Sequence, residues 1–468
     1  MRHFLLLSLL TGLVPIPVFA QQARDTTAVF TLPQAIRTAM TNYAVINAKR
    51  YAVGASAEEL RAARRDGLPD FTLGVETSLG TLDGMNGLSS GQPGLTTLTS
   101  GPAVPTQNWN AAFGALYLAN IDWNIYSFGL QRTHVAVSAG RYRQDQEDLK
   151  QEEFQQQVRV AGAYLSLLAA QRVRMAMEDN LERAMQLRTV IVLRTKNGLN
   201  PGVDSAIADA EVSNARLSLI DAENYEQTQA SQLSTQMGVA PRPFLLDTSF
   251  SQLLPKDTLD RLSADVSANP VLRFLDSRVT TSNLTARYLH KTALPRITLF
   301  GVGQERGSGF GTGYGNNPSD YSTGFLQGID PYRSNYLVGI GLTWDITNLG
   351  RASSRASAQR YRSSALASEY DLEENKLINQ FALSNQQIAN ALARYRETPI
   401  QLKSAGDAYG QKKALYENGL ATIVEISQTL YLLNRAEIAR DIACNAVWQA
   451  ILFKAGTVGD LNLFLQQL

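Results

Sequence analysis

The sequence predicts an internally duplicated α+β protein that combines short strand pairs with very long helices. Two observations carry this prediction. The first is a common order of elements in the two halves: a helix, two alternating strands, a very long helix, an Asn-Gly turn and a second long helix. The second is a set of positions that recur about 221 residues apart. The recurring positions are Trp123 and Trp344, Gly129 and Gly350, 197–199 and 418–420, and Gly238 and Gly459.

The beginning of the chain has the organisation of a signal peptide. Arg2 and His3 precede an apolar run at 4–13, and a small-residue cleavage site follows at 18–20. The run is too short to span a bilayer, and no later apolar stretch reaches about 18 residues. We therefore expect residues 1–20 to be removed and the mature chain to leave the cytoplasm. Any membrane-spanning part would have to consist of strands.

The composition is that of an ordinary ordered protein. Of 468 residues, 18% are charged and 44% are hydrophobic, and the net charge is +1. Basic and acidic residues are interspersed without a long basic run, which argues against a nucleic-acid partner. The single cysteine, Cys444, cannot form a disulfide within the chain, and we expect it to be a small buried residue of a helix.

The first repeat covers residues 21–238. Its first helix is expected at 31–65, where alanine and arginine dominate, and a strand pair is expected within 69–126. Two long helices are expected at 130–197 and 203–237, because these stretches lack proline and are rich in Gln, Glu, Arg, Ala and Leu. If continuous, the longer helix would measure roughly 100 Å.

The second repeat covers residues 257–468 and follows a proline-containing linker at 239–256. A loop rich in Gly, Tyr and Ser is expected at 307–333, and Pro399 is expected to kink a long helix. The predicted elements are a helix at 258–292, a strand pair within 295–347, and long helices at 351–417 and 422–455. The last helix begins with the spacing of a coiled-coil seam, at Ile423, Ile426, Leu430 and Leu433.

The alternation of the strands is typical of a membrane barrel. In the first strand Phe71, Leu73 and Val75 face one way, and the residues between them are small or polar. Each clear strand is about ten residues long, as in outer-membrane barrels. Three of the four tryptophans lie in or beside the strands, which suits a membrane interface. A soluble sandwich is the alternative, but so few strands separated by such long helices argue against it.

Four strands cannot close a barrel by themselves. Since open strand edges are not tolerated in lipid, several protomers must pool their strands. Two copies would supply eight strands, and three copies would supply twelve. Each strand pair runs almost directly into a long helix, with Gly129 and Gly350 as the expected joints. The helices are therefore expected to continue the tube beyond the membrane.

In this order of parts the chain resembles the TolC-like outer-membrane efflux factors over essentially all of the mature sequence. The resemblance is carried by Leu-Pro strand starts at 68–69 and 294–295, by the Trp-x5-Gly junctions and by two tip segments. The first tip, at 194–204, reads RTKNGLNPGVD. The second tip, at 416–425, reads YENGLATIVE.

The resemblance implies a homotrimer with a twelve-strand barrel in the outer-membrane lipid and a long periplasmic α-barrel. It implies the channel of a tripartite efflux or type I secretion system. The periplasmic tip would be closed at rest and would open when a periplasmic adaptor (membrane fusion) protein docks. An inner-membrane transporter of the RND or ABC type would supply the energy.

The two tip turns contain Gly198, Leu199, Gly419 and Leu420. The resemblance implies that these turns meet matching hairpins of the adaptor. The alternative is that each glycine ends a helix in the left-handed conformation that glycine tolerates best. The two interpretations are compatible.

Tyr416 and Asp204 match family positions at which a tyrosine of one tip helix bonds an acid of a neighbouring one, so the resemblance implies a gate. Such a bond contributes roughly 1.5–3 kcal/mol, which a docking partner can overcome. The alternative is an acid placed at a helix start and an unrelated packed tyrosine. Ala421 stands where the family has an arginine, so part of the closing network is expected to be missing.

Glu425 matches an acid that rings the narrowest part of the pore in this family. Three facing carboxylates would favour cations. The alternative is a capping box, in which Thr422 and Glu425 anchor the start of the last helix. Gln428 replaces the second ring acid of the family, so we expect a less acidic constriction.

The sequence offers no constellation for catalysis, a cofactor or a metal ion. His134 and His290 are isolated, without the ligand cluster that a metal site needs. We therefore expect a channel rather than an enzyme. The competing hypotheses are a passive porin-like channel, whose relatives carry all their strands in one chain, and a structural coiled-coil spacer, which has no use for the strand pairs.

Overall fold

The computed structural model describes residues 29–84, 104, 106–248 and 266–467. The predicted signal peptide lies outside these residues, as do parts of the first strand-pair loop and of the linker between the repeats. Within the described ranges, no helix offers a stretch that is long and apolar enough to cross a bilayer.

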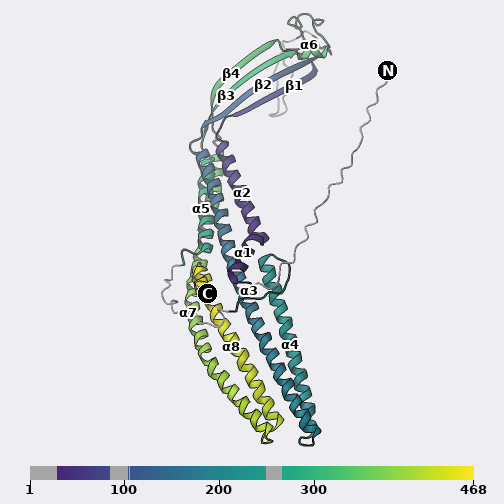
Figure 1. Ribbon diagram of the computed structural model, residues 1–468. Helices are drawn as coiled ribbons and strands as arrows, with labels where there is room; N and C mark the ends of the chain where they lie inside the picture. The colour runs from purple at the N-terminus through teal and green to yellow at the C-terminus, as the bar shows by residue number, and fades with distance from the viewer. Residues whose placement is uncertain (1–28, 85–103, 105, 249–265, 468) are drawn as a thin grey trace, which may run out of the picture. The chain divides into compact units, whose positions relative to one another are not determined.

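Figure 1 follows the chain through its helices and strands. In chain order they are α1 (Leu32–Asn42), α2 (Ala44–Arg65), β1 (Asp70–Thr81), β2 (Ala111–Tyr126), α3 (Leu130–Lys196), α4 (Gly202–Met237), α5 (Pro270–Lys291), β3 (Arg296–Ser308), α6 (Phe325–Ile329), β4 (Arg333–Thr343), α7 (Asn348–Glu417), α8 (Ile423–Val458) and α9 (Asn462–Leu465). The long helices begin and end within a few residues of the expected positions.

The chain divides into two compact units, and each unit is assembled from three separate stretches of sequence. The hairpin unit consists of Met1–Ala39, Arg159–Pro255 and Ala391–Gln449. The sheet unit consists of Met40–Val158, Lys256–Asn390 and Ala450–Leu468. Each unit therefore contains parts of both sequence repeats.

The sheet unit contains one antiparallel sheet with the strand order β1-β2-β3-β4. The first repeat supplies β1 and β2, the second supplies β3 and β4, and the pairing of β2 with β3 joins the two repeats (Figure 1). Within the described residues, the outer edges of β1 and β4 have no strand partner.

The two faces of this sheet differ in polarity, as the alternation of the sequence predicts. The pairing register places Val75 opposite Tyr117, and Gly301 opposite Val338, so that odd-numbered residues of β1, β2 and β3 share one face with even-numbered residues of β4. We call it the apolar face. Its large exposed side chains are Phe71, Leu73, Val75, Leu79, Ile121, Trp123, Tyr336, Val338, Ile340 and Leu342.

The opposite face carries more polar side chains, together with apolar ones such as Phe300, Val302 and Leu337. The ring of Phe300 lies across Gly339 and Gly341, and a Cβ on Gly339 would come within 2.6 Å of that ring. An aromatic side chain here covers strand positions that have no side chain of their own. The other members of this face include Thr72, Asn120, Asp122, Thr298 and Gln304.

The joints between strand and helix differ in the two repeats, which corrects the expectation that Gly129 and Gly350 play the same part. Gly129 has a φ of 90° and lies just before α3. Gly350 lies inside α7, which begins at Asn348. Asp345 explains the earlier start, because its Oδ1 accepts hydrogen bonds from the Asn348 backbone N–H at 3.2 Å and from the Thr347 hydroxyl at 2.7 Å.

Three other elements differ from the sequence expectations. The helix expected at 31–65 is divided into α1 and α2 at Tyr43, whose backbone is extended. Of the helix expected at 258–292, residues 258–265 lie outside the described residues, and residues 266–269 are not helical. Helix α5 begins at Pro270, and the Asn269 side chain caps it by accepting the Val271 N–H at 2.9 Å. The loop expected at 307–333 contains the short helix α6.

In the hairpin unit two helical hairpins pack against each other, one from each repeat. Helices α3 and α4 form the first hairpin, and α7 and α8 form the second. A bidentate ion pair links the hairpins, because Arg183 of α3 reaches both carboxylate oxygens of Glu437 of α8, at 3.1 and 2.6 Å. The predicted seam of α8 is buried, with Ile426 fully covered and Ile423, Leu430 and Leu433 less than 10% exposed. The predicted packing of this seam is therefore confirmed.

Candidate functional site: the tips of the two helical hairpins

The two tip turns have the same backbone geometry. Gly198 has a φ of 70° and Gly419 a φ of 77°. In the first turn the Leu199 N–H bonds to the Arg194 carbonyl at 2.9 Å and the Gly198 N–H to Thr195 at 3.0 Å. The second turn repeats both bonds, from Leu420 to Leu415 at 2.8 Å and from Gly419 to Tyr416 at 3.0 Å. This is a Schellman motif, so the interpretation that each glycine ends a helix is confirmed.

The same geometry exposes one leucine at each turn. Leu199 is 67% exposed and Leu420 is 74% exposed. A Cβ added at Gly198 would meet no atom within 4 Å, so the space around that turn is open. The turns therefore present an apolar side chain on a rigid backbone, which is a suitable surface for another protein. Docking itself stays a prediction.

Tyr416 and Asp204 are brought close, with Asn200 between them. The Asn200 side-chain amide donates to the Asp204 carboxylate at 2.7 Å and to the Tyr416 hydroxyl at 3.1 Å. Within the described part of the chain, no hydrogen bond joins Tyr416 directly to Asp204. Burial, followed by the nearby Asp204 carboxylate, raises the pKa of Tyr416, so its hydroxyl stays protonated.

Arg194 adds a guanidinium to this network from the first hairpin. Its Nη1 donates to the Glu417 carbonyl at 2.7 Å, and its Nε donates to Asn200 Oδ1 at 3.0 Å. The guanidinium carbon lies 5.7 Å from the centre of the Tyr416 ring, in cation–π contact. A positive charge therefore contacts the tyrosine although Ala421 occupies the arginine position of the family.

The Arg194 contacts also tie the two hairpins together. Arg194 and Asn200 belong to the first hairpin, whereas Glu417 and Tyr416 belong to the end of α7. The bond to the Glu417 carbonyl satisfies an acceptor at the C-terminal end of a helix, where a positive charge is favourable. We call Arg194, Asn200, Asp204 and Tyr416 the tip network.

A shared hydrophobic core supports the tip network from below. Tyr416 is only 2% exposed and packs with residues of three helices in addition to its own. The cluster consists of Leu187 and Ile191 of α3, Ala208 of α4, Tyr416 of α7, and Ile423 and Ile426 of α8. The tyrosine is therefore held in place by packing as well as by its hydrogen bond.

Glu425 is paired within its own hairpin. Its Oε1 lies 2.8 Å from Lys412 Nζ, and its Oε2 accepts the Thr422 backbone N–H at 2.8 Å. The Thr422 hydroxyl in turn accepts the Glu425 N–H at 3.4 Å, so the predicted capping box is confirmed. The hydrogen bond from Lys412, followed by those from Thr422, lowers the pKa of Glu425 from 4.5 to about 2. The carboxylate is charged, but Lys412 neutralises it locally.

Arg194, Asn200 and Lys412 take part in this site although sequence reasoning did not single them out. Asn200 and Arg194 contact residues that lie more than 200 positions away, and no local pattern marks them. A weak signal existed for Lys412, because a lysine thirteen positions before Glu425 faces it across a tight hairpin. The duplication itself brings the two hairpins to the same end of the unit.

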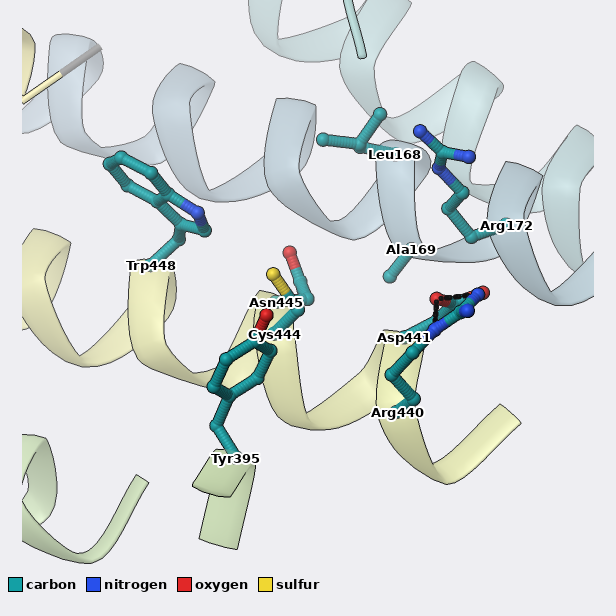
Figure 2. Close-up of a pocket in the computed structure, with 9 residues that line it drawn as sticks. All are labelled: Leu168, Ala169, Arg172, Tyr395, Arg440, Asp441, Cys444, Asn445 and Trp448. Atoms are coloured by element: carbon teal, nitrogen blue, oxygen red, sulfur yellow. Dashed lines mark hydrogen bonds and ion pairs between the residues drawn. The ribbon is translucent and has the colours of Figure 1, made fainter. Parts of the chain in front are cut away.

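The hairpin unit also contains a cavity of about 270 Å³ among α3, α7 and α8 (Figure 2). Arg440 donates twice to Asp441 at its rim, at 2.9 and 2.8 Å. Cys444 is 8% exposed beside the cavity, as the sequence predicts, and burial raises the pKa of its thiol. The lining consists of Leu168, Ala169, Arg172, Tyr395, Arg440, Asp441, Cys444, Asn445 and Trp448. In the described ranges, no three His, Cys, Asp or Glu side chains gather as a metal site.

Comparison with known proteins places this architecture among bacterial outer-membrane channels. Residues 269–445 match the family model described as outer membrane efflux protein. No curated protein sequence matches the chain. Several solved structures are similar at low sequence identity, and three of them illustrate the likeness. The outer-membrane channel OprN has a TM-score of 0.70 and 16% identity, over 95% of this chain and 96% of its own.

The other two structures come from named bacteria. The Campylobacter jejuni CmeC outer membrane channel has a TM-score of 0.75 and 13% identity, over 92% of this chain and 85% of its own. The Vibrio cholerae outer membrane protein VceC has a TM-score of 0.70 and 16% identity, over 92% of this chain and 96% of its own. The recognition of a TolC-like outer-membrane efflux factor is thus confirmed, since residues 269–445 match the outer membrane efflux protein family and nearly the whole chain has the fold of solved outer-membrane channels.

Proposed function

We propose that this chain is the outer-membrane channel of a tripartite efflux or type I secretion system. One observation carries the proposal. Its described residues form a sheet with a membrane-type apolar face and two open edges, and a pair of equivalent helical hairpins whose turns expose one leucine each. It is located in the outer membrane with a periplasmic extension, and cargo passes through it from the periplasm or the pump to the exterior.

The open edges of β1 and β4 support a homotrimer. In lipid, each unpaired backbone group costs several kcal/mol, so a sheet with two free edges has to be closed by other copies. Three copies of the four-stranded sheet give a twelve-strand barrel in which β1 of one copy pairs with β4 of the next. The apolar face then lies against lipid and the polar face lines the lumen.

The tips are the docking and gating part of the channel. Leu199 and Leu420, each on a Schellman turn, contact the hairpins of a periplasmic adaptor, and an inner-membrane transporter of the RND or ABC type supplies the energy. The tip network joins the two hairpins of a protomer, so that a partner pulling on either turn acts on both. The tips are closed at rest and open when the adaptor docks.

Transport through this channel requires no catalysis by the chain itself. The matched family is described as outer membrane efflux proteins, and we propose that this chain likewise works without a chemical step, a cofactor or a metal ion. Lys412 neutralises Glu425, and this pairing favours a constriction that is less selective for cations than a ring of free carboxylates.

Planar-bilayer conductance of the purified protein tests the proposal against its rivals. The wild-type channel should open rarely, and Tyr416→Phe with Asp204→Asn should raise the resting conductance. Steady high conductance of the wild type would instead indicate a porin-like channel. Absence of conductance in both proteins would indicate a structural spacer. An unchanged conductance in the double variant would refute the gate.

A further inference from the structure

The connection between β3 and β4 is packed on the apolar face of the sheet. We call residues 309–332 the α6 loop. The Tyr117 hydroxyl donates to the Ile329 carbonyl at 3.1 Å, and the rings of Phe113 and Phe325 meet edge to face at 5.1 Å. Phe113 and Tyr117 both belong to the apolar face. Figure 1 shows α6 at the end of the sheet that lies away from the strand-to-helix joints.

Gly307 allows this close approach. It lies on the apolar face of β3, and a Cβ at this position would come within 2.8 Å of the carbonyl oxygens of Asp330 and Gly328. Gly328 is buried against Phe113 in the same way, since a Cβ added at Gly328 would lie 2.4 Å from the Phe113 carbonyl oxygen. The two glycines therefore let the α6 loop lie directly on β2 and β3.

The α6 loop has a defined internal structure. The Gly309 N–H donates to the Phe113 carbonyl oxygen at 2.8 Å, and the Ser322 N–H donates to the Gly309 carbonyl oxygen at 2.7 Å. The Asp320 carboxylate accepts the Gly313 N–H at 2.8 Å, and Tyr314 is only 2% exposed. A loop with these bonds holds its outward side chains in fixed positions.

Three of the outward side chains of the α6 loop are large and apolar. Leu326 is 76% exposed, Phe325 is 49% exposed and Tyr332 is 52% exposed. They continue the apolar face, because α6 lies on that face and Phe325 touches Phe113 of β2. A single exposed leucine is ordinary on a protein surface, but a cluster that extends an apolar sheet face is informative.

The position of α6 along the strands matches one boundary of a membrane. Trp123 and Phe113 lie on the same face of β2, ten positions apart. At about 3.3 Å per residue and a tilt of about 40°, they are separated by roughly 25 Å along the barrel axis, which is the height of the apolar band of an outer-membrane barrel. Trp123 marks the boundary near the helices, so α6 marks the other one.

We infer that the α6 loop is a membrane-surface anchor, in which Phe325, Leu326 and Tyr332 rest in the outer leaflet of the bilayer around the barrel. The inference rests on the proposed function, which places the apolar face against lipid. A second copy of the chain is not the occupant, because copies meet at the edges of β1 and β4, whereas α6 covers β2 and β3. Aromatic and aliphatic side chains at this depth are suited to the lipid boundary.

Depth-dependent fluorescence quenching of the full-length protein in lipid nanodiscs tests the anchor. Cys444→Ala provides a cysteine-free chain, and Leu326→Cys introduces the only site for an environment-sensitive label. Two matched sites are Val338→Cys on the apolar face of β4 and Asn316→Cys, which is exposed in the same loop. The quenchers are phosphatidylcholines brominated near the headgroup or near the chain end, and iodide in the water.

The anchor predicts that headgroup-proximal bromine causes the larger loss of fluorescence at Leu326→Cys, chain-end bromine at Val338→Cys, and iodide at Asn316→Cys. Lipid quenching at Val338→Cys with only iodide quenching at Leu326→Cys would overturn the anchor and leave the barrel intact. Iodide quenching at Val338→Cys would overturn the proposed membrane barrel as well.

Discussion

Trp344 donates its indole N–H to the carbonyl oxygen of Ala293 at 3.0 Å, and Trp123 makes the equivalent bond to Gly67 at 3.0 Å. Each acceptor directly precedes a Leu-Pro strand start. The tryptophan near the end of one strand therefore fixes the beginning of its partner strand in both repeats. The duplicated sequence thus carries a duplicated joint, and the joint closes the lower end of each strand pair.

Trp344→Phe removes this bond while keeping an aromatic ring at the joint. We expect the free energy of unfolding of the sheet unit to fall by about 1 kcal/mol, the usual net contribution of one hydrogen bond. Trp344 and Trp123 are 49% and 37% exposed, so a larger loss is not expected. Denaturant unfolding, monitored by hydrogen exchange of the strand amides, measures this loss of stability. Trp109→Phe is the control, since Trp109 is 83% exposed, and an equal loss there would contradict the joint.

Gly339→Ala should destabilise the sheet, because the new Cβ would come within 2.6 Å of the Phe300 ring. Overpacking of this kind costs about 1–3 kcal/mol. The matched control is Gly303→Ala in β3, where a Cβ meets nothing within 4 Å. A lower melting temperature for Gly339→Ala alone, restored by adding Phe300→Leu, is the expected pattern. Equal melting temperatures for both glycine variants would show that the Phe300 contact is unimportant.

Asn200→Ala should raise the resting conductance at least as much as the double change at Tyr416 and Asp204. The reason is that the Asn200 amide donates to both residues and its oxygen accepts from Arg194. Planar-bilayer recording of single channels measures the effect. Asn197→Ala, an exposed asparagine of the same turn, should leave the conductance unchanged. If both asparagine variants behave alike, the tip network does not control the gate.

The start of α8 should lose protection at low pH. The pKa of Glu425 is lowered from 4.5 to about 2, so its stabilising contribution is present above pH 4.5 and disappears as the pH falls through about 2. Hydrogen exchange at the first turn of α8 measures it, corrected for the intrinsic pH dependence. The start of α5 is the reference, because its cap is the non-titrating amide of Asn269.

Lys412→Gln gives the second half of this pH test. Removal of the ammonium group should raise the pKa of Glu425, because the hydrogen bond from Lys412 is the largest cause of the shift. The loss of protection should therefore begin at a higher pH in this variant. An unchanged profile would mean that Thr422 alone holds the carboxylate.

The sequence predicts the parts of this molecule that local chemistry determines. The alternation of Phe71, Leu73 and Val75 defines the face of β1, and Gly198 and Gly419 mark the two helix ends, because only local sterics are involved. The capping box of Thr422 and Glu425 is local in the same sense.

The remaining features depend on contacts between distant residues. Arg194 meets Tyr416, and Asn200 meets both Tyr416 and Asp204, only after the hairpins of both repeats have packed together. The defined structure of the α6 loop also depends on a distant residue. Its glycines and aromatic residues suggest an irregular loop, whereas the contact with Tyr117 of β2 gives it a defined structure. The prediction of Gly350 as a joint was wrong, because the Asp345 side chain caps α7 and this helix begins earlier than the repeat suggests.

The most direct test of the proposed function is to place a photo-crosslinking residue at Leu420 in living cells and to identify what it captures. Tyr225, half-exposed on α4, is a suitable comparison site. The proposed function predicts capture of a periplasmic adaptor at Leu420, and also at Leu199, but not at Tyr225. Absence of adaptor capture at both turns, with the protein present in the outer membrane, would contradict it.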